Sequence, residues 1–322
     1  MLAAYAASQS ADDPISGLQV GEQPDPEPRA GWSVVTLRAA ALNHHDLFSL
    51  QGVGLPADRL PMVLGCDGAG VDEDGNEVVV HSVVPSEGWM GDETLDPRRT
   101  LLSERYAGTL AERVAVPSRN LVPKPAELSW QHAACLPTSW LTAYKMLFSN
   151  AGVSPGATVL VQGAGGGVAT AAVQLGSAAG LRMWVTSRDE AKRARAVELG
   201  AEQAFESGAR LPERVDAVLE TVGAATWSHS MKSLKPGGTV VVAGATSGDP
   251  SRMEINRIFF TQLRVVGSTM GTRDELERLV RFVTERKIEP VVDSVLPLGD
   301  VRTGLEKMAA GDLFGKVVLT MG

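Results

Sequence analysis

The segment from residue 159 to residue 180 limits the possible folds of this chain more than any other feature. It reads VLVQGAGGGVATAAVQLGSAAG: an apolar run leads into five small residues and then into apolar residues at helical spacing. This order predicts a strand, a tight glycine turn and a helix. In that geometry, bare N–H groups at the start of a helix face the pyrophosphate of a dinucleotide. The segment therefore predicts a parallel α/β sheet that binds a nicotinamide dinucleotide and acts on a small-molecule substrate.

Composition narrows the classes of partner. The chain has 322 residues, 44% of them hydrophobic, which is enough for two domains with substantial cores. Its net charge of −8 and its lack of basic runs argue against nucleic acid and membrane surfaces as partners. The two cysteines, Cys66 and Cys135, cannot form a disulfide framework or a four-cysteine zinc site. Because the sequence shows no signal peptide and no membrane-spanning run, we expect a cytoplasmic protein.

The pattern of the chain changes near residue 129. Before it, apolar runs broken by glycine and proline predict short strands. These runs cover residues 32–42, 63–71, 77–84 and 108–117. The polar stretch 85–106 predicts a surface loop. From residue 129 to residue 287 strands and helices alternate, which predicts a doubly wound parallel sheet. The tail from residue 288 returns to strand, helix and strand, and local pattern leaves open which domain it completes.

The glycine turn supplies the residues expected to hold the pyrophosphate. Gly163 permits a sharp turn, Gly166 lets a phosphate approach the backbone, and Ala169 lets the helix pack closely on the strand. The alternative is a small-residue turn in a sheet that binds nothing. The residues predicted to bind the cofactor here are Gly163, Gly165, Gly166, Gly167 and Val168.

The end of the second strand of this sheet bears on the choice between NADH and NADPH. An NAD-binding site usually places a carboxylate there for the ribose hydroxyls, but Ser187 occupies the position. Arg188 and Lys192, one helical turn apart, can hold a 2′-phosphate through contacts worth roughly 1.5–3 kcal/mol. We therefore predict NADPH, with Ser187, Arg188 and Lys192 in its site. The alternative is a solvated basic helix start with Asp189 facing the ribose.

Two later loops carry small residues after inner strands. VVVAGATSG (residues 240–248) and VVGSTMG (residues 265–271) end at the same edge of the predicted sheet as the glycine turn. Their backbones can reach the nicotinamide, whereas the alternative is that both are ordinary turns at strand ends. The residues added to the predicted cofactor site are Gly244, Ala245, Thr246 and Ser268.

These motifs together resemble the medium-chain dehydrogenase/reductase superfamily, in particular its zinc-free quinone oxidoreductase-like and enoyl reductase-like branch. The resemblance covers nearly the whole chain and rests on five ordered segments: AALNHHDLFSLQG (40–52), LGCDGAG (64–70), GTLAERVAVPSRNLVPKP (108–125), LTAY (141–144) and FGKVVL (314–319). It implies a GroES-like, β-rich catalytic domain formed by residues 1–128 and 288–322, with a Rossmann cofactor domain, residues 129–287, inserted between them. It also implies a homodimer joined through the edges of the Rossmann sheets.

The chain departs from the zinc members of this superfamily at each ligand position that the resemblance implies. Asn43 stands in place of a cysteine, Cys66 in place of a histidine, and Thr138 in place of the third ligand. Catalytic zinc needs about three donors with nitrogen, sulfur or carboxylate character, and Cys66 alone cannot supply them. His44 and His45 cannot easily aim at one point from a helix, because neighbouring side chains diverge by about 100°. We therefore expect no metal.

Three residues are candidates for catalysis. Asn43 is predicted to face the nicotinamide and the substrate oxygen, although it can equally cap a helix. Thr142 is similar to the superfamily's hydroxyl beside the nicotinamide; the alternative is helix packing. His45 lies where zinc members place a relay hydroxyl and can deliver a proton, the alternative being a partly buried or solvated histidine. Asp46 is expected to be a buried structural acceptor.

The predicted reaction follows from the expected lack of a metal. Without zinc to polarise a simple ketone, an activated alkene or a quinone is the easier hydride acceptor, since negative charge spreads to a conjugated oxygen. We therefore predict an NADPH-dependent, zinc-independent oxidoreductase that transfers hydride to a quinone or an α,β-unsaturated carbonyl compound. Two alternatives stay open: metal-free carbonyl/alcohol oxidoreduction in a biosynthetic pathway, and a non-catalytic NADPH-binding scaffold or sensor.

Overall fold

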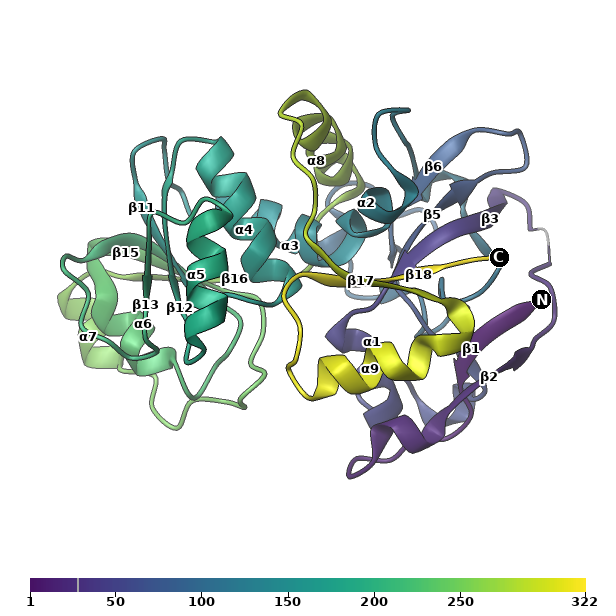
Figure 1. Ribbon diagram of the computed structural model, residues 1–322, viewed down its shortest axis with the longest axis horizontal. Helices are drawn as coiled ribbons and strands as arrows, with labels where there is room; N and C mark the ends of the chain where they lie inside the picture. The colour runs from purple at the N-terminus through teal and green to yellow at the C-terminus, as the bar shows by residue number, and fades with distance from the viewer. Residues whose placement is uncertain (28) are drawn as a thin grey trace. The chain divides into compact units, whose positions relative to one another are not determined.

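The computed structural model describes residues 1–27 and 29–322, which form two compact units (Figure 1). The first unit comprises residues 1–141 and 271–322. The second unit comprises residues 142–270 and is inserted into the first. In the part of the chain that the structure describes, no helix is long and apolar enough to cross a membrane.

The second unit is built on a six-stranded sheet whose strands all run parallel. The strands are β11 (Thr158–Gln162), β12 (Arg182–Thr186), β13 (Gln203–Phe205), β14 (Val215–Glu220), β15 (Leu234–Val242) and β16 (Arg264–Gly267). Their spatial order is β13-β12-β11-β14-β15-β16, in which the direction of strand addition reverses between β11 and β14. This is the order of a Rossmann sheet, so the predicted α/β fold is confirmed.

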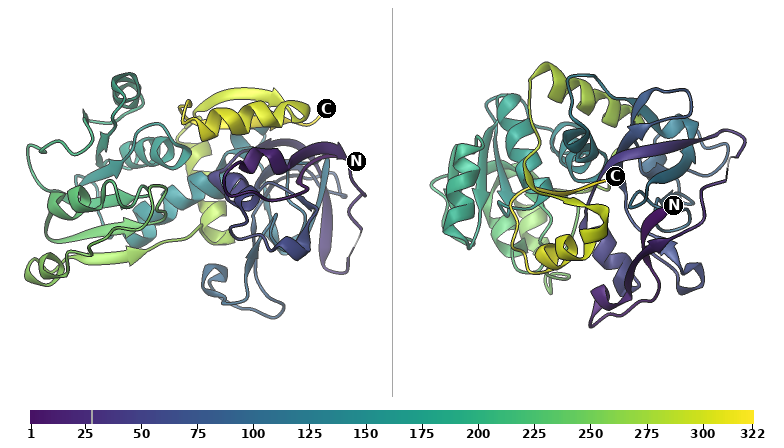
Figure 2. Two further views of the ribbon diagram at one scale, coloured as in Figure 1. Left: turned by 90° about the horizontal axis from the view of Figure 1, so that it is seen from below. Right: turned by 45° about the vertical axis from the view of Figure 1, so that its right-hand side comes forward.

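Helices cover both faces of this sheet. They are α4 (Gly167–Ala178), α5 (Glu190–Glu198), α6 (Trp227–Ser233) and α7 (Ile255–Phe260). Figure 1 and Figure 2 show α4 and α5 on one side of the sheet and α6 and α7 on the other. Burial of both faces explains why the strands are continuous apolar runs. Leu160, Trp184, Val218 and Val240 from four strands form one core with Met231 of α6.

The described residues of the first unit, 1–27, 29–141 and 271–322, form three β-sheets. The strands before residue 141 are β1 (Leu2–Ala6), β2 (Leu18–Glu22), β3 (Trp32–Ala41), β4 (Met62–Val63), β5 (Asp67–Val71), β6 (Glu77–Val80), β7 (Val83–Val84), β8 (Thr100–Leu101), β9 (Arg113–Pro117) and β10 (Leu121–Pro123). Strand β3 organises the largest sheet, because it pairs antiparallel with both β5 and β9. Alternating burial along β3 fits a sheet with one face on the core. This β-rich unit is the predicted GroES-like domain.

The C-terminal segment completes the same sheet. It contains β17 (Val292–Pro297), α9 (Val301–Ala309) and β18 (Lys316–Thr320). Strand β18 pairs antiparallel with β3 and parallel with β17. Helix α9 contacts α1 (His44–Gln51), and Leu50, Leu305 and Leu319 share one hydrophobic core. Segments from the two ends of the chain therefore build one unit.

The boundaries between the units differ from the predicted ones. The sequence places them at residues 128/129 and 287/288, whereas the structure places them at 141/142 and 270/271. Helix α8 (Arg273–Glu285) accounts for the second difference, because it packs on β10 and on the π-helical segment η5 (Leu136–Trp140) of the first unit. Its amphipathic pattern predicts the helix correctly but does not say which core its apolar face covers.

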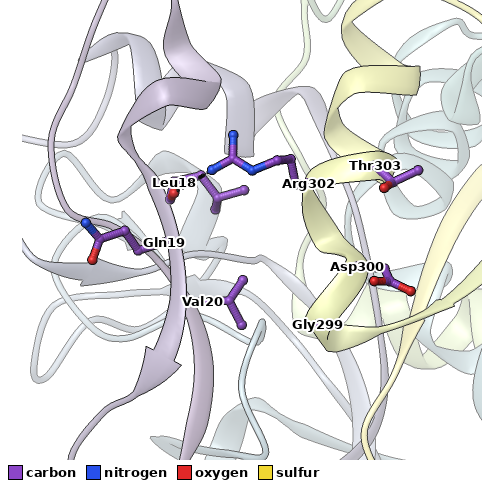
Figure 3. A pocket seen from close by; sticks show the side chains of 7 residues that line it. All are labelled: Leu18, Gln19, Val20, Gly299, Asp300, Arg302 and Thr303. Carbon is purple, nitrogen blue, oxygen red and sulfur yellow. Dashed lines mark hydrogen bonds between the residues drawn. The ribbon is translucent and has the colours of Figure 1, made fainter.

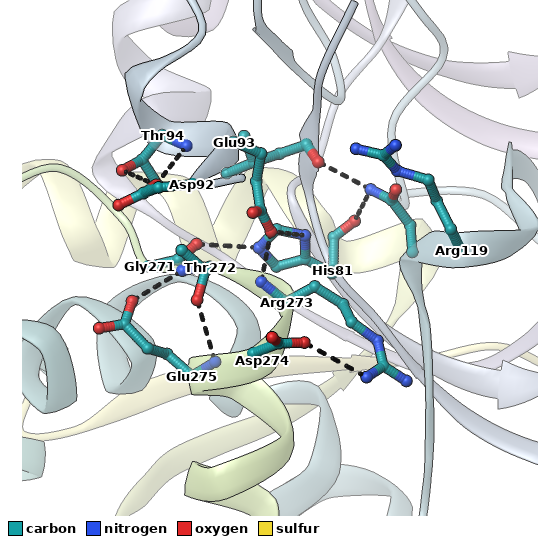
Figure 4. A network of polar contacts seen from close by, with 12 residues as sticks. His81, Asp92, Glu93, Thr94, Arg119, Gly271, Thr272, Arg273, Asp274 and Glu275 are labelled. Carbon is teal, nitrogen blue, oxygen red and sulfur yellow. Dashed lines mark hydrogen bonds and ion pairs between the residues drawn. The ribbon is translucent and has the colours of Figure 1, made fainter. Parts of the chain in front are cut away.

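A buried polar network fastens the start of α8 to the first unit (Figure 4). The His81 ring, which is 1% exposed, donates from Nε2 to the Gly271 carbonyl oxygen at 2.9 Å. The Glu93 carboxylate accepts a hydrogen bond from the N–H of Arg273. Burial lowers the pKa of His81, which favours its neutral form. Glu93 lies in the stretch 85–106, so part of this predicted surface loop is a buried anchor.

The segment between residues 129 and 150 is helical but irregular. It contains α2 (Trp130–Ala134), then η5, α3 (Leu141–Tyr144) and a second π-helical segment, η6 (Lys145–Asn150). Pro137 lies in the first turn of η5, where a residue without an N–H cannot continue the preceding hydrogen-bond ladder. Pro137 thus coincides with a change in helix type. Such π-helical insertions are frequent at functional sites.

Candidate active site

The turn after β11 has the backbone geometry of a phosphate-binding loop. Gly163 has a φ of +95°, which side-chain-bearing residues rarely adopt. A Cβ atom on Gly163 or Gly166 would meet no atom within 4 Å, so the space beside both residues is open. Gly166 is the N-cap of α4, and within residues 1–27 and 29–322 no side chain caps that helix start. The first N–H groups of α4 are thus available to an anion. Gly165, Gly167 and Val168 lie in the same turn and helix start.

Two more loops end at the same edge of the sheet and are held to each other. The N–H of Ser247 donates to the Val222 carbonyl oxygen at 2.7 Å, which continues the pairing of β14 and β15 beyond the strands. A Cβ on Gly223 would lie 2.5 Å from the Gly248 carbonyl oxygen, so this close approach requires glycine. The loop after β15 is therefore fixed through its backbone. It contains three predicted cofactor residues, Gly244, Ala245 and Thr246.

Ser268 and Thr142 are the remaining polar candidates in the second unit. The N–H of Ser268 donates to the Val242 carbonyl oxygen at 2.8 Å, which places Ser268 beside the end of β15. The Ser268 Oγ atom is buried and has no hydrogen-bond partner among the described residues, so it can accept a ligand or a water. Thr142 lies in α3 and is 8% exposed. Its burial is compatible with either helix packing or a contact to a bound group.

A buried polar network behind the glycine turn escaped the sequence analysis. The Glu220 carboxylate, at the end of β14, accepts hydrogen bonds from the N–H groups of Val222 and Gly223 and from the Ser230 hydroxyl. Gln162, at the end of β11, donates to Ser230 and accepts from Thr186. The network joins the ends of three adjacent strands to α6 and fixes the turns that follow them. Its only sequence signal is a polar residue at the end of each apolar strand.

The ribose end of the predicted cofactor site lies after β12. Asp189 caps α5, because its Oδ1 atom accepts a hydrogen bond from the N–H of Lys192 at 3.1 Å. Arg188 is exposed, and the side chain of Arg193 donates to the Ser187 carbonyl oxygen at 2.6 Å. Arg193, which the sequence analysis did not single out, therefore fixes the backbone at Ser187. Arg188 and Lys192 keep the positions next to this turn in which a 2′-phosphate contact was predicted.

In the first unit, the predicted catalytic residue Asn43 belongs to a buried ionic cluster. Its Nδ2 atom donates to Asp67 Oδ2 at 2.8 Å and to the Ala41 carbonyl oxygen at 3.3 Å. Its Oδ1 atom accepts from Lys316 Nζ at 2.6 Å, and Lys316 also pairs with Asp67 Oδ2 at 2.9 Å. Both amide hydrogens of Asn43 are thus donated within the protein. Asn43 can bind a substrate oxygen only if one of these bonds breaks.

Asp46 ties the same region together, as predicted for a buried acceptor. Its carboxylate accepts from the N–H of Asn43 at 2.8 Å and from the N–H of Gly65 at 3.0 Å. Burial raises the pKa of Asp46 to about 6, although the bond from Asn43 acts in the opposite direction. Asn43 is the N-cap of α1, so Asp46 joins the start of this helix to the segment before β5.

The two adjacent histidines of α1 have different surroundings. His45 Nε2 lies 3.8 Å from Glu104 Oε1, and the His45 side chain is 17% exposed. His44 is exposed, yet desolvation and then the charge of Lys316 lower the pKa of its ring. The buried Nε2 atom of His45 has no hydrogen-bond partner among the described residues, so it can pair with a ligand or a water.

A surface pocket of about 530 Å³ lies elsewhere in the first unit (Figure 3). It lies between β2 and the start of α9, and Figure 3 shows Arg302 reaching across toward Leu18. The Arg302 guanidinium donates to the carbonyl oxygens of Ile15 and Leu18 at 3.0 and 2.9 Å. The positive charge of Arg302 thus holds the backbone of the first unit together, and none of the predicted site residues lines this pocket.

Comparisons with known proteins show the family to which this chain belongs. Residues 29–126 match the family model described as alcohol dehydrogenase GroES-like domain, and residues 167–285 match the model described as zinc-binding dehydrogenase. The chain is 32% identical to acryloyl-coenzyme A reductase of Metallosphaera sedula, over 94% of this chain and 96% of that protein. The chain belongs to the medium-chain dehydrogenase/reductase superfamily, a family of oxidoreductases. The predicted superfamily is therefore confirmed.

Further relatives widen the range of activities. Crotonyl-CoA carboxylase/reductase of Cereibacter sphaeroides is 25% identical, over 92% of this chain and 81% of that protein. A crystal structure of an NAD-dependent alcohol dehydrogenase has a TM-score of 0.91 and 36% identity, with full coverage of both chains. A cobalt- and zinc-bound alcohol dehydrogenase from Pyrobaculum aerophilum has a TM-score of 0.89 and 28% identity, with 99% of each chain covered. Reductases of activated alkenes and alcohol dehydrogenases are thus both relatives of this chain.

Metal binding in relatives raises the question of whether this chain can hold zinc. The Cys66 Sγ atom faces the Leu102 carbonyl oxygen at 3.2 Å, and burial raises the pKa of this thiol well above its usual value. A protonated thiol is a poor ligand. Asn43 and Asp67 already hold the Lys316 ammonium, whose charge repels a dication. In residues 1–27 and 29–322, no three His, Cys, Asp or Glu side chains gather where they could hold a metal. These residues do not fit zinc.

Proposed function

We propose that this protein is an NADPH-dependent, zinc-independent reductase of activated alkenes, with α,β-unsaturated carbonyl compounds or quinones as substrates. One observation carries the proposal. The Lys316 ammonium pairs with Asn43 and Asp67, two residues of the segments in which zinc relatives hold their metal. A simple ketone then has no metal ion to polarise it. A conjugated acceptor needs less help, because it delocalises the charge that hydride addition creates.

The proposed reaction depends more on orienting the hydride donor and the acceptor than on activating the acceptor. Bound NADPH supplies a hydride for the β-carbon of the activated alkene, and a proton then completes the product at the α-carbon. Holding two reacting groups at the right distance and orientation can lower the reaction barrier by up to about 7–11 kcal/mol. The second unit contributes the fixed loops after β11, β14 and β15 to this task. The network of Gln162, Thr186 and Glu220 keeps these loops in place.

The chain's residues suit NADPH in two respects. The open space at Gly163 and Gly166 and the uncapped start of α4 suit a pyrophosphate. Arg188 and Lys192 follow the end of β12, and their positive charges favour a 2′-phosphate. One carboxylate oxygen of Asp189 caps α5 and is therefore not available to the ribose hydroxyls.

His45 is the proposed proton donor. Its ring lies 3.8 Å from the Glu104 carboxylate, and its buried Nε2 atom has no hydrogen-bond partner among the described residues. Histidine is the most frequent proton donor in enzyme active sites, and such a group can protonate an enolate. In this assignment Asn43 keeps α1 and its histidines in position rather than touching the substrate.

The relatives support an unsaturated acyl thioester as one substrate class. Acryloyl-coenzyme A reductase is a relative at 32% identity, and its name describes reduction of a conjugated thioester. The alternative function is metal-free carbonyl reduction, favoured by the 36% identity to an NAD-dependent alcohol dehydrogenase. The two functions differ in the acceptor and can be separated directly.

The test is consumption of NADPH in four parallel assays, with acryloyl-CoA, crotonyl-CoA, a benzoquinone and a simple aldehyde as acceptors. Turnover with a thioester or the quinone, and none with the aldehyde, supports the proposal. Turnover with the aldehyde alone supports the alternative. Tight binding of NADPH with no turnover in any assay contradicts both and favours a binding protein.

We also propose that two copies of the chain pair through β16. This strand ends the sheet, so one of its edges is unpaired within the second unit. Val265 on β16 and Ile255, Phe259 and Phe260 on α7 are large apolar residues that stay exposed, Phe260 to 78%. A second copy would cover them and continue the sheet. Light scattering should give a dimer for the wild type and a monomer for Phe260→Glu; a monomeric wild type contradicts the pairing.

A further inference from the structure

His229 lies on α6 of the second unit, and each nitrogen of its ring has a partner. The Nδ1 atom lies 2.9 Å from Gln162 Nε2, and the Nε2 atom lies 2.9 Å from the Ala209 carbonyl oxygen. Gln162 ends β11, whereas Ala209 lies in the loop that follows β13. Strand β12 lies between β11 and β13 in the sheet, so one side chain of α6 joins two segments that are not neighbours.

The Glu220 carboxylate sets the direction of the hydrogen bonds that lead to His229. The Ser230 hydroxyl donates its only hydrogen to Glu220 Oε2 at 2.5 Å, so toward other groups it can only accept. The Gln162 amine therefore donates to Ser230 at 2.9 Å, and its second hydrogen faces His229 Nδ1. Nδ1 must then be the bare nitrogen of the ring. The ring hydrogen is on Nε2, where it is donated to Ala209.

The other end of the Gln162 amide leads to the glycine turn. Its Oε1 atom accepts a hydrogen bond from the Thr186 hydroxyl at 2.7 Å, and Thr186 Oγ1 accepts one from the N–H of Gly163 at 3.4 Å. Gln162 is 1% exposed, so water does not readily replace a lost partner. An amide that loses His229 keeps an unpaired buried donor, which favours its rotation. A change at His229 therefore reaches Gly163 through two side chains.

We propose that His229 is a positioning residue for the dinucleotide. As the acceptor for Gln162, it holds the turns after β11 and β14 in the arrangement that receives the pyrophosphate. The effect on binding rests on the cofactor proposed above. The order of the same turns without a ligand does not depend on that cofactor, so the two parts can be tested separately.

Calorimetric titration with NADPH and with NADH tests the effect on binding. His229→Leu keeps much of the bulk of the ring and removes both contacts, so affinity for either dinucleotide should fall about tenfold, the value of one buried hydrogen bond. His229→Asn, whose Oδ1 atom can replace Nδ1 as an acceptor, should bind both within about threefold of the wild type. The matched control is Ser233→Ala, which removes a hydrogen bond to the His229 carbonyl oxygen from the same helix and should bind normally.

A double-mutant cycle shows whether His229 acts through Gln162. Gln162→Met removes the amide, keeps the length of the side chain and should show the same loss of about tenfold, so it serves as the test if His229→Leu does not fold. In the Gln162→Met background, His229→Leu should weaken binding by less than about twofold, because the contact is already absent. A full additional loss in that background, or a His229→Asn variant as weak as His229→Leu, would overturn the proposal.

Hydrogen exchange of the protein without nucleotide separates this proposal from the cofactor assignment. Peptides that contain Gly163 and Gly223 should exchange faster in His229→Leu than in the wild type, and at the wild-type rate in Ser233→Ala. Unchanged exchange together with unchanged affinity contradicts the role of His229. A wild type that binds neither dinucleotide contradicts the proposed cofactor instead, and the exchange rates then decide whether His229 orders the turns.

Discussion

The polar sites of the two units differ in the groups that form them: backbone groups in one and side chains in the other. In the second unit the candidate cofactor site is mostly backbone: glycine turns, an uncapped helix start and two loops that continue the sheet. In the first unit the site is made of side chains, and Asn43, Asp67 and Lys316 meet although 249 residues separate the last two. The first kind of site depends on local sequence order. The second depends on the fold as a whole, so single substitutions should affect the two sites in different ways.

The largest effect should follow from removing the counter-charge in the first unit. Asp67→Asn leaves the Lys316 ammonium buried without a carboxylate, and breaking a buried pair from one side costs about 3–5 kcal/mol. Denaturant unfolding of the two proteins measures this loss. Asp25→Asn, which removes an exposed partner of Arg113, is the matched control and should change stability by less than about 1 kcal/mol. If Asp67→Asn lowers the free energy of unfolding no more than the control does, the cluster contributes little to stability.

Asp46 should make the same cluster sensitive to pH. Its pKa is about 6 in the folded chain and 3.8 in the unfolded reference, so the folded state holds the extra proton between these values. The free energy of unfolding contributed by Asp46 therefore falls as pH rises from about 4 to 6, by roughly 3 kcal/mol in total. The measurement is the stability difference between wild type and Asp46→Asn at several pH values. A difference that stays flat or grows over this range would contradict the raised pKa.

In the second unit, the effect should appear in binding rather than in stability. Gly166→Asp places a carboxylate in the open space beside the start of α4, where it repels a pyrophosphate. Affinity for NADPH should fall at least about 100-fold, equivalent to about 2.7 kcal/mol, while Tm stays near that of the wild type. Calorimetric titration measures the affinity. Gly299→Asp, another glycine with open space beside it, should bind NADPH normally. Normal NADPH binding by Gly166→Asp would show that the turn is not part of the cofactor site.

The smallest effect concerns the choice of cofactor. Arg188→Ala should weaken NADPH by about 10- to 100-fold, the value of one charge-assisted contact to a 2′-phosphate, and should leave NADH nearly unchanged. The control is Arg210→Ala, an exposed arginine of the same unit that is not part of the predicted site. Equal losses for both cofactors in Arg188→Ala would count against the phosphate contact.

These differences also explain what the sequence could reveal. The strands and helices of the second unit follow from apolar periodicity and from glycine at strand ends, and the structure shows the predicted alternation of strand and helix. Val161, Gly163 and Gly166 are sequence neighbours, so a short window contains the whole turn. The cap at Asp189 is equally local, because this residue accepts its hydrogen bond from Lys192, three residues further on.

Long-range contacts could not be predicted in this way. Nothing near Lys316 in the sequence indicates that its ammonium meets Asn43 and Asp67, because those contacts depend on β18 pairing with β3. The same limit applies to the unit boundaries. The apolar stripe of α8 predicts that the helix is buried on one side, and only the packed fold shows that β10 lies on that side.

The proposed function depends on a site that works without a metal ion, in which Asn43 and Asp67 are bound to the Lys316 ammonium. Metal analysis of the purified wild-type protein, combined with NADPH turnover before and after treatment with a strong chelator, tests this most directly. We predict well under one zinc per chain and an unchanged rate after chelation. Stoichiometric zinc, with activity that disappears on chelation and returns when zinc is added, would contradict it.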